Sequence, residues 1–307
     1  MSGQSGSRGR LLLTGARGFV GRRVLEHAAA RFDVHAVSSA HAVTSGMATW
    51  HQADLLDQRA VESLVHAVRP SHVLHLAWYT EHGLYWNAPQ NLAWTAATLT
   101  LIEAFSRAGG SRFVGVGTCA EYAADAGTAI EGITPERPWT LYGECKLALA
   151  RILADFSARQ HFGSAWARLF YLFGPGESPQ RFVPSLVRSL ARNEDAVCRH
   201  PALVRDYLYV DDAAAALVAL VASETTGTVN IGSGAPVALG DLARLVADRA
   251  GQPGRVRVDP PVAPAAEPLV VAADVTRLTR DVGWRPTWSL ATAVDETIAW
   301  WAANSVR

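Results

Sequence analysis

The stretch Thr14-Gly15-Ala16-Arg17-Gly18-Phe19-Val20-Gly21 directly follows an apolar run, Leu11-Leu12-Leu13. The apolar run predicts a buried strand, and the residues from Phe19 onward predict a helix. Glycine permits the tight turn between them and, lacking a Cβ, lets the backbone approach a pyrophosphate, whose charge a helix N-terminus favours. The stretch therefore predicts a dinucleotide-binding loop. Its predicted cofactor contacts are Gly15, Arg17, Gly18, Phe19, Val20 and Gly21.

Strands and helices alternate through the first half of the chain. Apolar runs predict strands at 10–14, 33–38, 71–76, 112–117 and 164–169. Helical patterns separate these runs at 19–31, 58–68, 91–108 and from 141 onward. Helices between strands imply crossover connections, which are right-handed almost without exception. The predicted fold class is α/β, a doubly wound parallel Rossmann sheet with a smaller C-terminal α/β substrate-binding domain.

The character of the sequence changes after residue 173. Gly174-Pro175-Gly176 interrupts the alternation, and proline and alanine accumulate at 253–268. The first nine residues are rich in serine and glycine and lack an apolar signal core. We expect a flexible tail at 1–9, an NADP-binding Rossmann domain at 10–170 to which 205–225 returns, and a mainly substrate-binding domain at 171–307.

Composition argues against several classes of function. The formal net charge is zero, which gives no reason to expect a nucleic-acid partner. Cys119, Cys145 and Cys198 lack metal-ligand spacing, and their odd number argues against a disulfide framework. The longest apolar run, 213–222, is far shorter than the roughly 20 residues that cross a bilayer. We expect a cytoplasmic protein that binds no metal, nucleic acid or membrane.

The end of the second strand distinguishes the two nicotinamide dinucleotides. A site for NAD usually places a carboxylate there, on the ribose 2′-hydroxyl, whereas this chain has Ser38 and Ser39. Arg17 adds a guanidinium that can pair with a 2′-phosphate. NADP(H) is therefore favoured, and NAD(H) is the alternative. Asp54, with Leu55 beside it in the expected cofactor wall, either accepts a hydrogen bond from the adenine amine or caps the next helix.

Tyr142 and Lys146 stand four residues apart, which places both side chains on one face of a helix. A phenol with a pKa near ~10 exchanges protons poorly at neutral pH. A neighbouring ammonium stabilises the phenolate and makes the tyrosine usable as a general acid or base. Lys146 can also hold the nicotinamide ribose. The pair is the predicted catalytic centre.

Eight segments spread over nearly the whole chain carry a family resemblance. They are Thr14 to Gly21, His75-Leu76-Ala77, Thr118 to Tyr122, Tyr142 to Lys146, Gly174-Pro175-Gly176, Arg205 to Asp212, Asn230-Ile231-Gly232 and Gly283-Trp284-Arg285-Pro286. In this order they resemble the extended short-chain dehydrogenase/reductases that act on nucleotide sugars: epimerases, 4,6-dehydratases and 4-ketoreductases. The resemblance implies that Thr118 joins the catalytic pair by hydrogen-bonding the reacting carbonyl, and that Leu76 and Ala77 contact the cofactor. It also implies a homodimer formed through helices near 91–108 and 141–161.

Departures from the family pattern narrow the reaction. In the dehydratases the residues after the Ser/Thr are Asp and Glu, but here they are Cys119 and Ala120, so 4,6-dehydration is not expected. An epimerase keeps tightly held NAD, whereas a reductase consumes hydride and commonly draws on NADPH. The predicted NADP preference favours NADPH-dependent reduction of a nucleotide-linked 4-keto-6-deoxy sugar. The alternatives are an NAD-dependent nucleotide-sugar 4-epimerase and, from another class, a non-catalytic NADP-binding sensor or scaffold.

The acceptor side of the site shows both agreement and departure. Arg205 matches an arginine that clamps the substrate diphosphate in similar enzymes, but a second arginine is missing from 265–268. Tyr171 and Trp94 stand where an asparagine is common. The polar and aromatic loop 78–86 suits stacking against a sugar ring. The predicted substrate contacts are Thr80, Cys119, Tyr171 and Arg205.

Overall fold

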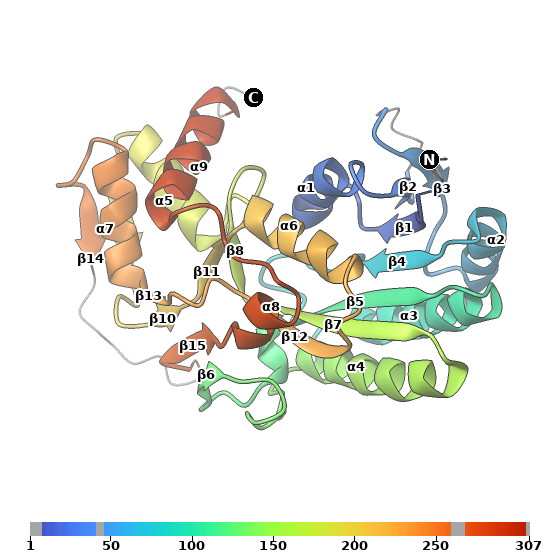
Figure 1. Cartoon of the computed structure of the whole chain (residues 1–307). Coiled ribbons are helices and arrows are strands. Elements are labelled where there is room, and N and C mark those ends of the chain that lie inside the picture. The colour runs from blue at the N-terminus through green and yellow to red at the C-terminus, as the bar shows by residue number, and fades with distance from the viewer. Residues whose placement is uncertain (1–7, 41–45, 259–267, 305–307) are drawn as a thin grey trace, which may run out of the picture.

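The computed structural model describes residues 8–40, 46–258 and 268–304. Its centre is a seven-stranded parallel sheet in the order β12-β7-β5-β4-β1-β2-β3 (Figure 1). Its strands are β1 (Arg10–Thr14), β2 (Asp33–Ser38), β3 (Thr49–Gln52), β4 (His72–His75), β5 (Arg112–Thr118), β7 (Gly163–Leu169) and β12 (Gly227–Ile231). The chain adds strands on one side of β1 and then on the other. The predicted doubly wound sheet is confirmed.

Helices cover both faces of this sheet because its strands are apolar on both sides. In β1, Leu11 and Leu13 join one hydrophobic cluster while Leu12 joins another, as the twofold alternation of a strand requires. The helices of the first cluster are α1 (Phe19–Ala28), α6 (Val210–Val221) and the short α8 (Thr276–Arg280), which contributes Leu278. Those of the second are α2 (Gln58–Val68), α3 (Gln90–Arg107) and α4 (Leu141–Gln160). The sheet is thus sandwiched between two helical layers.

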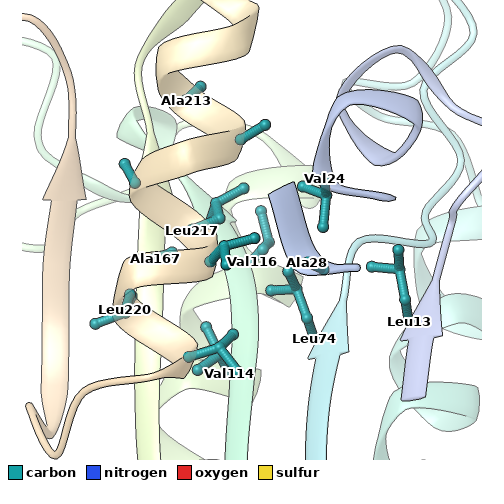
Figure 2. Close-up of a cluster of buried hydrophobic side chains, with 14 of the residues drawn as sticks. Leu13, Val24, Ala28, Leu74, Val114, Val116, Ala167, Ala213, Leu217 and Leu220 are labelled. Atoms are coloured by element: carbon teal, nitrogen blue, oxygen red, sulfur yellow. The ribbon is translucent and has the colours of Figure 1, made fainter. Parts of the chain in front are cut away.

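Helix α6 extends the first layer although it lies far along the chain. Figure 2 shows Leu217 of α6 beside Val116 of β5, with Ala28 of α1 close by. Buried alanines such as Ala213 allow the two helices to approach closely. Strand β12 then pairs with β7 at the edge of the same sheet. Residues 210–231 therefore contact the first half of the chain, while the domain boundaries themselves remain a prediction.

The remaining described residues form a smaller region beside the sheet. Its helices are α5 (Phe182–Ala191), α7 (Leu239–Arg249) and α9 (Leu290–Asn304), and a short 3₁₀ turn, η1, spans Cys119–Glu121. Its strands are β6 (Gly127–Ala129), β8 (Tyr171–Phe173), β9 (Ala196–Cys198), β10 (Val204–Arg205), β11 (Tyr207–Tyr209), β13 (Val237–Ala238), β14 (Val256–Val258) and β15 (Val270–Ala273). Helices α5, α7 and α9 share a third hydrophobic cluster.

Side-chain caps set the start of two helices that border the site. The hydroxyl of Thr140 accepts a hydrogen bond from the Gly143 amide at 3.1 Å, which fixes the beginning of α4. Asp57 caps α2 in the same way. Asp54 instead accepts a hydrogen bond from the Leu56 amide at 3.0 Å. Of the two interpretations of Asp54, the helix-capping one is therefore wrong.

Within residues 8–40, 46–258 and 268–304, no helix has the length and apolarity needed to cross a membrane. No cluster of three or more His, Cys, Asp or Glu side chains there is arranged to hold a metal ion. Cys119, Cys145 and Cys198 are free thiols.

Candidate active site

A cavity of about 1210 Å³ follows the carboxyl ends of the parallel strands. Ligands of open α/β sheets bind at this edge, because loops from both helical layers converge there. The predicted contacts that line the cavity are Gly15, Arg17, Gly18, Phe19, Val20, Gly21, Ser38, Ser39, Asp54, Leu55, Leu76, Ala77, Thr80, Thr118, Cys119, Tyr142, Lys146, Tyr171 and Arg205. The fold therefore brings every predicted site residue to one cavity, and the role of each residue stays a prediction.

The loop between β1 and α1 requires glycine at two positions. Gly15 has a φ of +69°, and a Cβ on it would lie 2.8 Å from the Ala77 amide nitrogen. A Cβ on Gly21 would lie 2.1 Å from the Gly15 carbonyl oxygen. Helix α1 begins after Gly18 without a side-chain cap, so its first amides face the cavity unclaimed by any described side chain. This cradle fits the pyrophosphate of a dinucleotide.

Thr14 ties the glycine loop to the segment that follows β4. Its hydroxyl accepts hydrogen bonds from the amides of Leu76 at 3.1 Å and Ala77 at 3.2 Å. His75 contacts the same hydroxyl at 2.8 Å and Thr98 at 2.9 Å. Complete burial lowers the pKa of His75 to about 3, so its imidazole is neutral. His75 is therefore a structural residue that holds two cofactor-side segments together.

At the end of β2, serines and an arginine stand where NAD sites place an acid. The Arg17 guanidinium donates to the Ser38 hydroxyl at 3.4 Å, and Ser39 follows at the exposed edge of the cavity. The Ser38 hydroxyl also accepts a hydrogen bond from the Ala40 amide. The arginine thus lies over the strand end that receives the adenosine ribose in this fold.

Thr118, Tyr142 and Lys146 meet at the end of β5. Thr118 is the last residue of that strand, and its hydroxyl is hydrogen-bonded with the Tyr142 side chain. The Lys146 ammonium donates to the Val116 carbonyl at 2.8 Å. The Tyr142 amide donates to the Trp86 carbonyl at 2.9 Å. The β5 backbone and the start of α4 therefore position all three predicted catalytic side chains.

The two ionisable members of this trio have strongly shifted pKa values. Burial raises the pKa of Tyr142, and the nearby Tyr85 and Glu121 act in the same direction. The Thr118 hydrogen bond opposes these effects. Burial lowers the pKa of Lys146 to about 7, against the attraction of Glu121. The phenol is therefore protonated at neutral pH, where it can act as a proton donor, while the lysine lies close to its titration.

A buried network of charges fixes the back of Thr118. The Glu121 carboxylate accepts hydrogen bonds from the Thr118 amide at 2.8 Å and from the Trp166 indole at 3.0 Å. Arg168 donates to Glu121 at 2.6 Å and to Glu136 at 2.6 Å. Glu121 and Arg168 are almost completely inaccessible to solvent, and neither lines the cavity. These residues hold the strand end and face away from the reacting groups.

Aromatic rings enclose Tyr142 on the cavity side. Tyr85 and Trp86 stand edge-on to it, with ring centroids at 5.1 Å and 6.0 Å. Trp139 stacks on Trp86 at 5.7 Å and keeps 49% of its surface exposed. Trp78 lies 6.3 Å from the Tyr142 ring. The reacting centre is therefore bounded by a largely apolar wall.

The cavity also holds two titratable residues, Glu177 and Arg181, that the sequence did not single out. Burial raises the pKa of Glu177 to about 8, while Arg181 opposes the shift. The Arg181 guanidinium lies 5.7 Å from the Tyr85 ring centroid, and both Glu177 and Arg181 line the cavity. Glu177 directly follows the Gly174-Pro175-Gly176 motif, and that position was the only available sequence signal. Distance along the chain hides the approach of Arg181 to Tyr85.

Arg205 and Cys119 both line the cavity, but the guanidinium is engaged by backbone carbonyls and the thiol is shielded from ionisation. Arg205 is buried, and its guanidinium donates to the carbonyls of Val204 at 2.9 Å and Leu269 at 3.2 Å. It also lies 5.5 Å from the Tyr171 ring centroid. Burial raises the pKa of Cys119 to about 12, so its thiol is not an activated nucleophile. The interpretation of Cys119 as a lining thiol is consistent with this environment.

A family model provides the first comparison with known proteins. The NAD dependent epimerase/dehydratase family matches residues 11–232 of the 307. This chain belongs to that family. It is therefore an enzyme of the extended short-chain dehydrogenase/reductase type, as its motifs predicted, and the family is NAD(P)-dependent.

Curated relatives and solved structures agree with this assignment. The dTDP-L-rhamnose 4-epimerase of Burkholderia thailandensis is 27% identical, over 97% of this chain and 96% of the relative. The GDP-6-deoxy-D-mannose reductase of Pseudomonas aeruginosa is 26% identical, over 96% of this chain and 98% of the relative. The UDP-glucose 4-epimerase of Thermotoga maritima, solved with UDP-glucose, is similar in fold, with a TM-score of 0.85 at 21% identity over 96% of this chain and 99% of that one. The chain therefore shares a family with nucleotide-sugar epimerases and reductases.

Proposed function

We propose that this enzyme reduces the 4-keto group of a nucleotide-linked 6-deoxy sugar with NADPH. The observation that carries the proposal is Arg17 at the end of β2, where NAD sites place an acid, in a cavity that also holds the Thr118–Tyr142 pair. Reduction needs a proton donor at the carbonyl oxygen, and Tyr142 is placed to serve as that donor.

The residues at the end of β2 support NADPH over NADH. A 2′-phosphate carries two negative charges that Arg17 can meet with paired donors. Ser38 and Ser39 add hydroxyl donors and place no negative charge beside that phosphate. An acid at this strand end would instead favour the free 2′-hydroxyl of NAD.

The residues around the carbonyl account for the proton and charge movements. The dinucleotide, when bound, supplies the hydride. Thr118 donates a hydrogen bond to the substrate carbonyl oxygen, and Tyr142 gives that oxygen its proton as negative charge develops. Lys146 stabilises the phenolate that remains and holds the ribose hydroxyls. These donors lie on a strand end and a capped helix, so they need little reorganisation.

Two features argue against elimination of water. Cys119 and Ala120 occupy the positions where dehydratases have their acid and base, and the Cys119 thiol stays protonated. Glu121, the next acidic residue, is turned away from the cavity toward Arg168. No described side chain after Thr118 on η1 can therefore remove water from the sugar.

The aromatic wall supports a sugar that has lost a hydroxyl. Tyr85, Trp86 and Trp139 offer ring surfaces that stack on C–H groups of a pyranose. A hydroxyl facing these rings would lose water without gaining a partner, which costs about 1–3 kcal/mol. Thr80 and Arg205 contribute polar contacts at other points of the cavity.

An NAD-dependent 4-epimerase is the second candidate. The similarity to dTDP-L-rhamnose 4-epimerase favours it, because that relative also acts at carbon four. An epimerase consumes no reduced cofactor and would retain it through purification. The balance between the two candidates rests on Arg17 and on the absence of an acid at Ser38 and Ser39.

The deciding experiment follows NADPH oxidation with a panel of 4-keto-6-deoxy nucleotide sugars. We expect stoichiometric loss of NADPH with at least one sugar and a much slower reaction with NADH. Cofactor retained after purification, together with interconversion of 4-epimers and no NADPH loss, would establish the epimerase instead. Binding of NADPH without turnover of any sugar would favour a sensor or scaffold.

We also propose that the enzyme is a cytoplasmic homodimer formed through α3 and α4. These helices pack side by side, and each exposes an apolar residue, Leu92 on α3 and Ile152 on α4. Burying such residues against a second copy is favourable. Sedimentation should show a dimer, and a Leu92→Glu, Ile152→Glu variant should sediment as a monomer.

A further inference from the structure

The catalytic lysine has an aromatic partner that the sequence pattern does not show. The Lys146 Nζ atom lies 3.7 Å from the centroid of the Trp78 ring, well within cation–π range. The Tyr142 and Trp166 centroids are both 6.0 Å from the same atom. The same ammonium donates a hydrogen bond to the Val116 carbonyl at 2.8 Å. Trp78 is therefore the nearest ring to the charge.

The Trp78 ring is held firmly in this position. Its indole N–H donates to the Asn91 side-chain oxygen at 2.9 Å. Asn91 is completely buried and donates in turn to the carbonyls of Tyr85 at 2.7 Å and Ala88 at 2.9 Å. Trp94 packs beside Trp78 at 6.3 Å. The start of α3 thus orients the ring that faces Lys146.

No carboxylate among the described residues forms an ion pair with Lys146. The titratable groups that act on it are Glu121 from η1 and Cys145 from α4. The Tyr142 ring lies on the same helix as Lys146, and the Lys146 charge contributes to the lowered pKa of His75 on β4. Glu121 is already engaged by Arg168 at 2.6 Å, and His75 is neutral. A buried ammonium in this setting needs another source of stabilisation.

We propose that Trp78 is a positioning residue that keeps the Lys146 ammonium charged and aimed beside Tyr142. The proposal rests on the proposed reaction for its catalytic consequence, but its physical content concerns the free enzyme. An indole face attracts only the protonated amine, so it opposes the effect of burial. A carboxylate in its place would also hold the charge, but it would repel the phenolate and the cofactor phosphates.

The composition of the chain allows a direct test, because Lys146 is its only lysine. Protein labelled with ¹³C- and ¹⁵N-lysine therefore gives a single lysine side-chain signal. In the wild type we expect the Lys146 Hε resonances to be displaced upfield by the ring current of Trp78. Resonances at the position of a free lysine would overturn the proposal without any variant.

The second measurement is the pH titration of that signal with and without the ring. In Trp78→Leu we expect the upfield displacement to disappear and the titration midpoint to fall by about one pH unit, the size of a desolvated cation–π attraction. Trp78→Phe keeps a weaker ring and should show a smaller fall. An unchanged midpoint in either folded variant would overturn the proposal.

Trp139→Leu is the matched control, since it removes a tryptophan from the same cavity wall without touching Lys146. Its lysine signal and midpoint should match those of the wild type. If the proposed reduction is correct, the alkaline limb of the pH profile of its rate should lie about one pH unit lower in Trp78→Leu than in the wild type. A uniform loss of rate at every pH would indicate a merely structural role. Failure of the wild type to reduce any sugar would refute the proposed function and leave the titration result standing.

Discussion

The two sides of the β5 strand end differ in how a buried cation is stabilised. Behind Thr118, Arg168 is matched by Glu121 and Glu136, each at 2.6 Å. In front, Lys146 meets a backbone carbonyl and a tryptophan face. The two carboxylates beside Arg168 help to keep its guanidinium charged, whereas burial lowers the pKa of Lys146, which has no carboxylate ion pair among the described residues, to about 7. The pairing behind the strand provides rigidity, and its absence in front preserves proton exchange.

The largest expected effect concerns the reacting side. Tyr142→Phe should lower kcat by about 10³-fold or more, because the variant keeps the ring but cannot donate a proton. Cofactor binding, followed by NADPH fluorescence, should be unchanged. Tyr85→Phe, which removes a hydroxyl from the adjacent ring, is the control and should keep most of the activity. Turnover in Tyr142→Phe near the wild-type rate would refute the mechanism.

Substitutions of the carboxylates that pair with Arg168 should change the free energy of unfolding. Glu121→Ala leaves the Arg168 guanidinium buried with one carboxylate, so the free energy of unfolding should fall by about 3–5 kcal/mol. Glu136 keeps 30% of its side chain exposed, and Glu136→Ala should cost far less. Denaturant titrations of both variants measure the difference. Equal losses of unfolding free energy in the two variants would mean that the burial of Glu121 does not make its ion pair more important than that of Glu136.

Lys146→Met tests the unpaired side by its pH dependence. The folded-state pKa of about 7 lies below the ordinary 10.5, so the unfolded chain binds more protons between these values. Burying the charged lysine is therefore most costly below pH 7. Methionine should raise the free energy of unfolding there by about 2–4 kcal/mol, and the gain should vanish as pH rises toward 10.5. A gain independent of pH would contradict the assigned shift.

The smallest effect is expected at the cofactor end, far from either set of charges. Arg17→Ala should weaken NADPH binding by about 10–100-fold, the range of a lost charge-assisted hydrogen bond, and leave NADH binding almost unchanged. Arg23→Ala is the control, because that half-buried arginine pairs with Glu26 and does not line the cavity. Equal weakening of both cofactors would remove the basis for an NADP preference.

Local sequence patterns were sufficient for the sheet and much of the cavity. The apolar run before Gly15 predicts a buried strand. Gly15 and Gly21 tolerate no other residue, because a Cβ at either position would collide with the backbone. The Tyr142–Lys146 spacing likewise places both side chains on one helix face. Short strands such as β3 and β12 went unpredicted. Their few residues lack a period that distinguishes them from loops.

The partners of the site residues could not be read in the same way. Trp78 and Lys146 are 68 positions apart, and Glu121 and Arg168 are 47 apart, so no local pattern connects them. Tyr85, Trp86 and Trp139 were visible as aromatic residues, but only their packing shows that they enclose Tyr142. The sequence also could not show which nearby aspartate caps α2; the structure shows that Asp57 does so and Asp54 does not.

By itself, the sequence determined the parallel sheet, the glycine cradle and the placement of Tyr142 and Lys146 on one helix. These depend on backbone sterics and on the periodicity of helix and strand, which act over a few residues. Only the tertiary structure decided which charges are paired and which are left to titrate. Ionisation depends on burial and on groups within a few ångströms, and the fold alone sets which distant residues share that space.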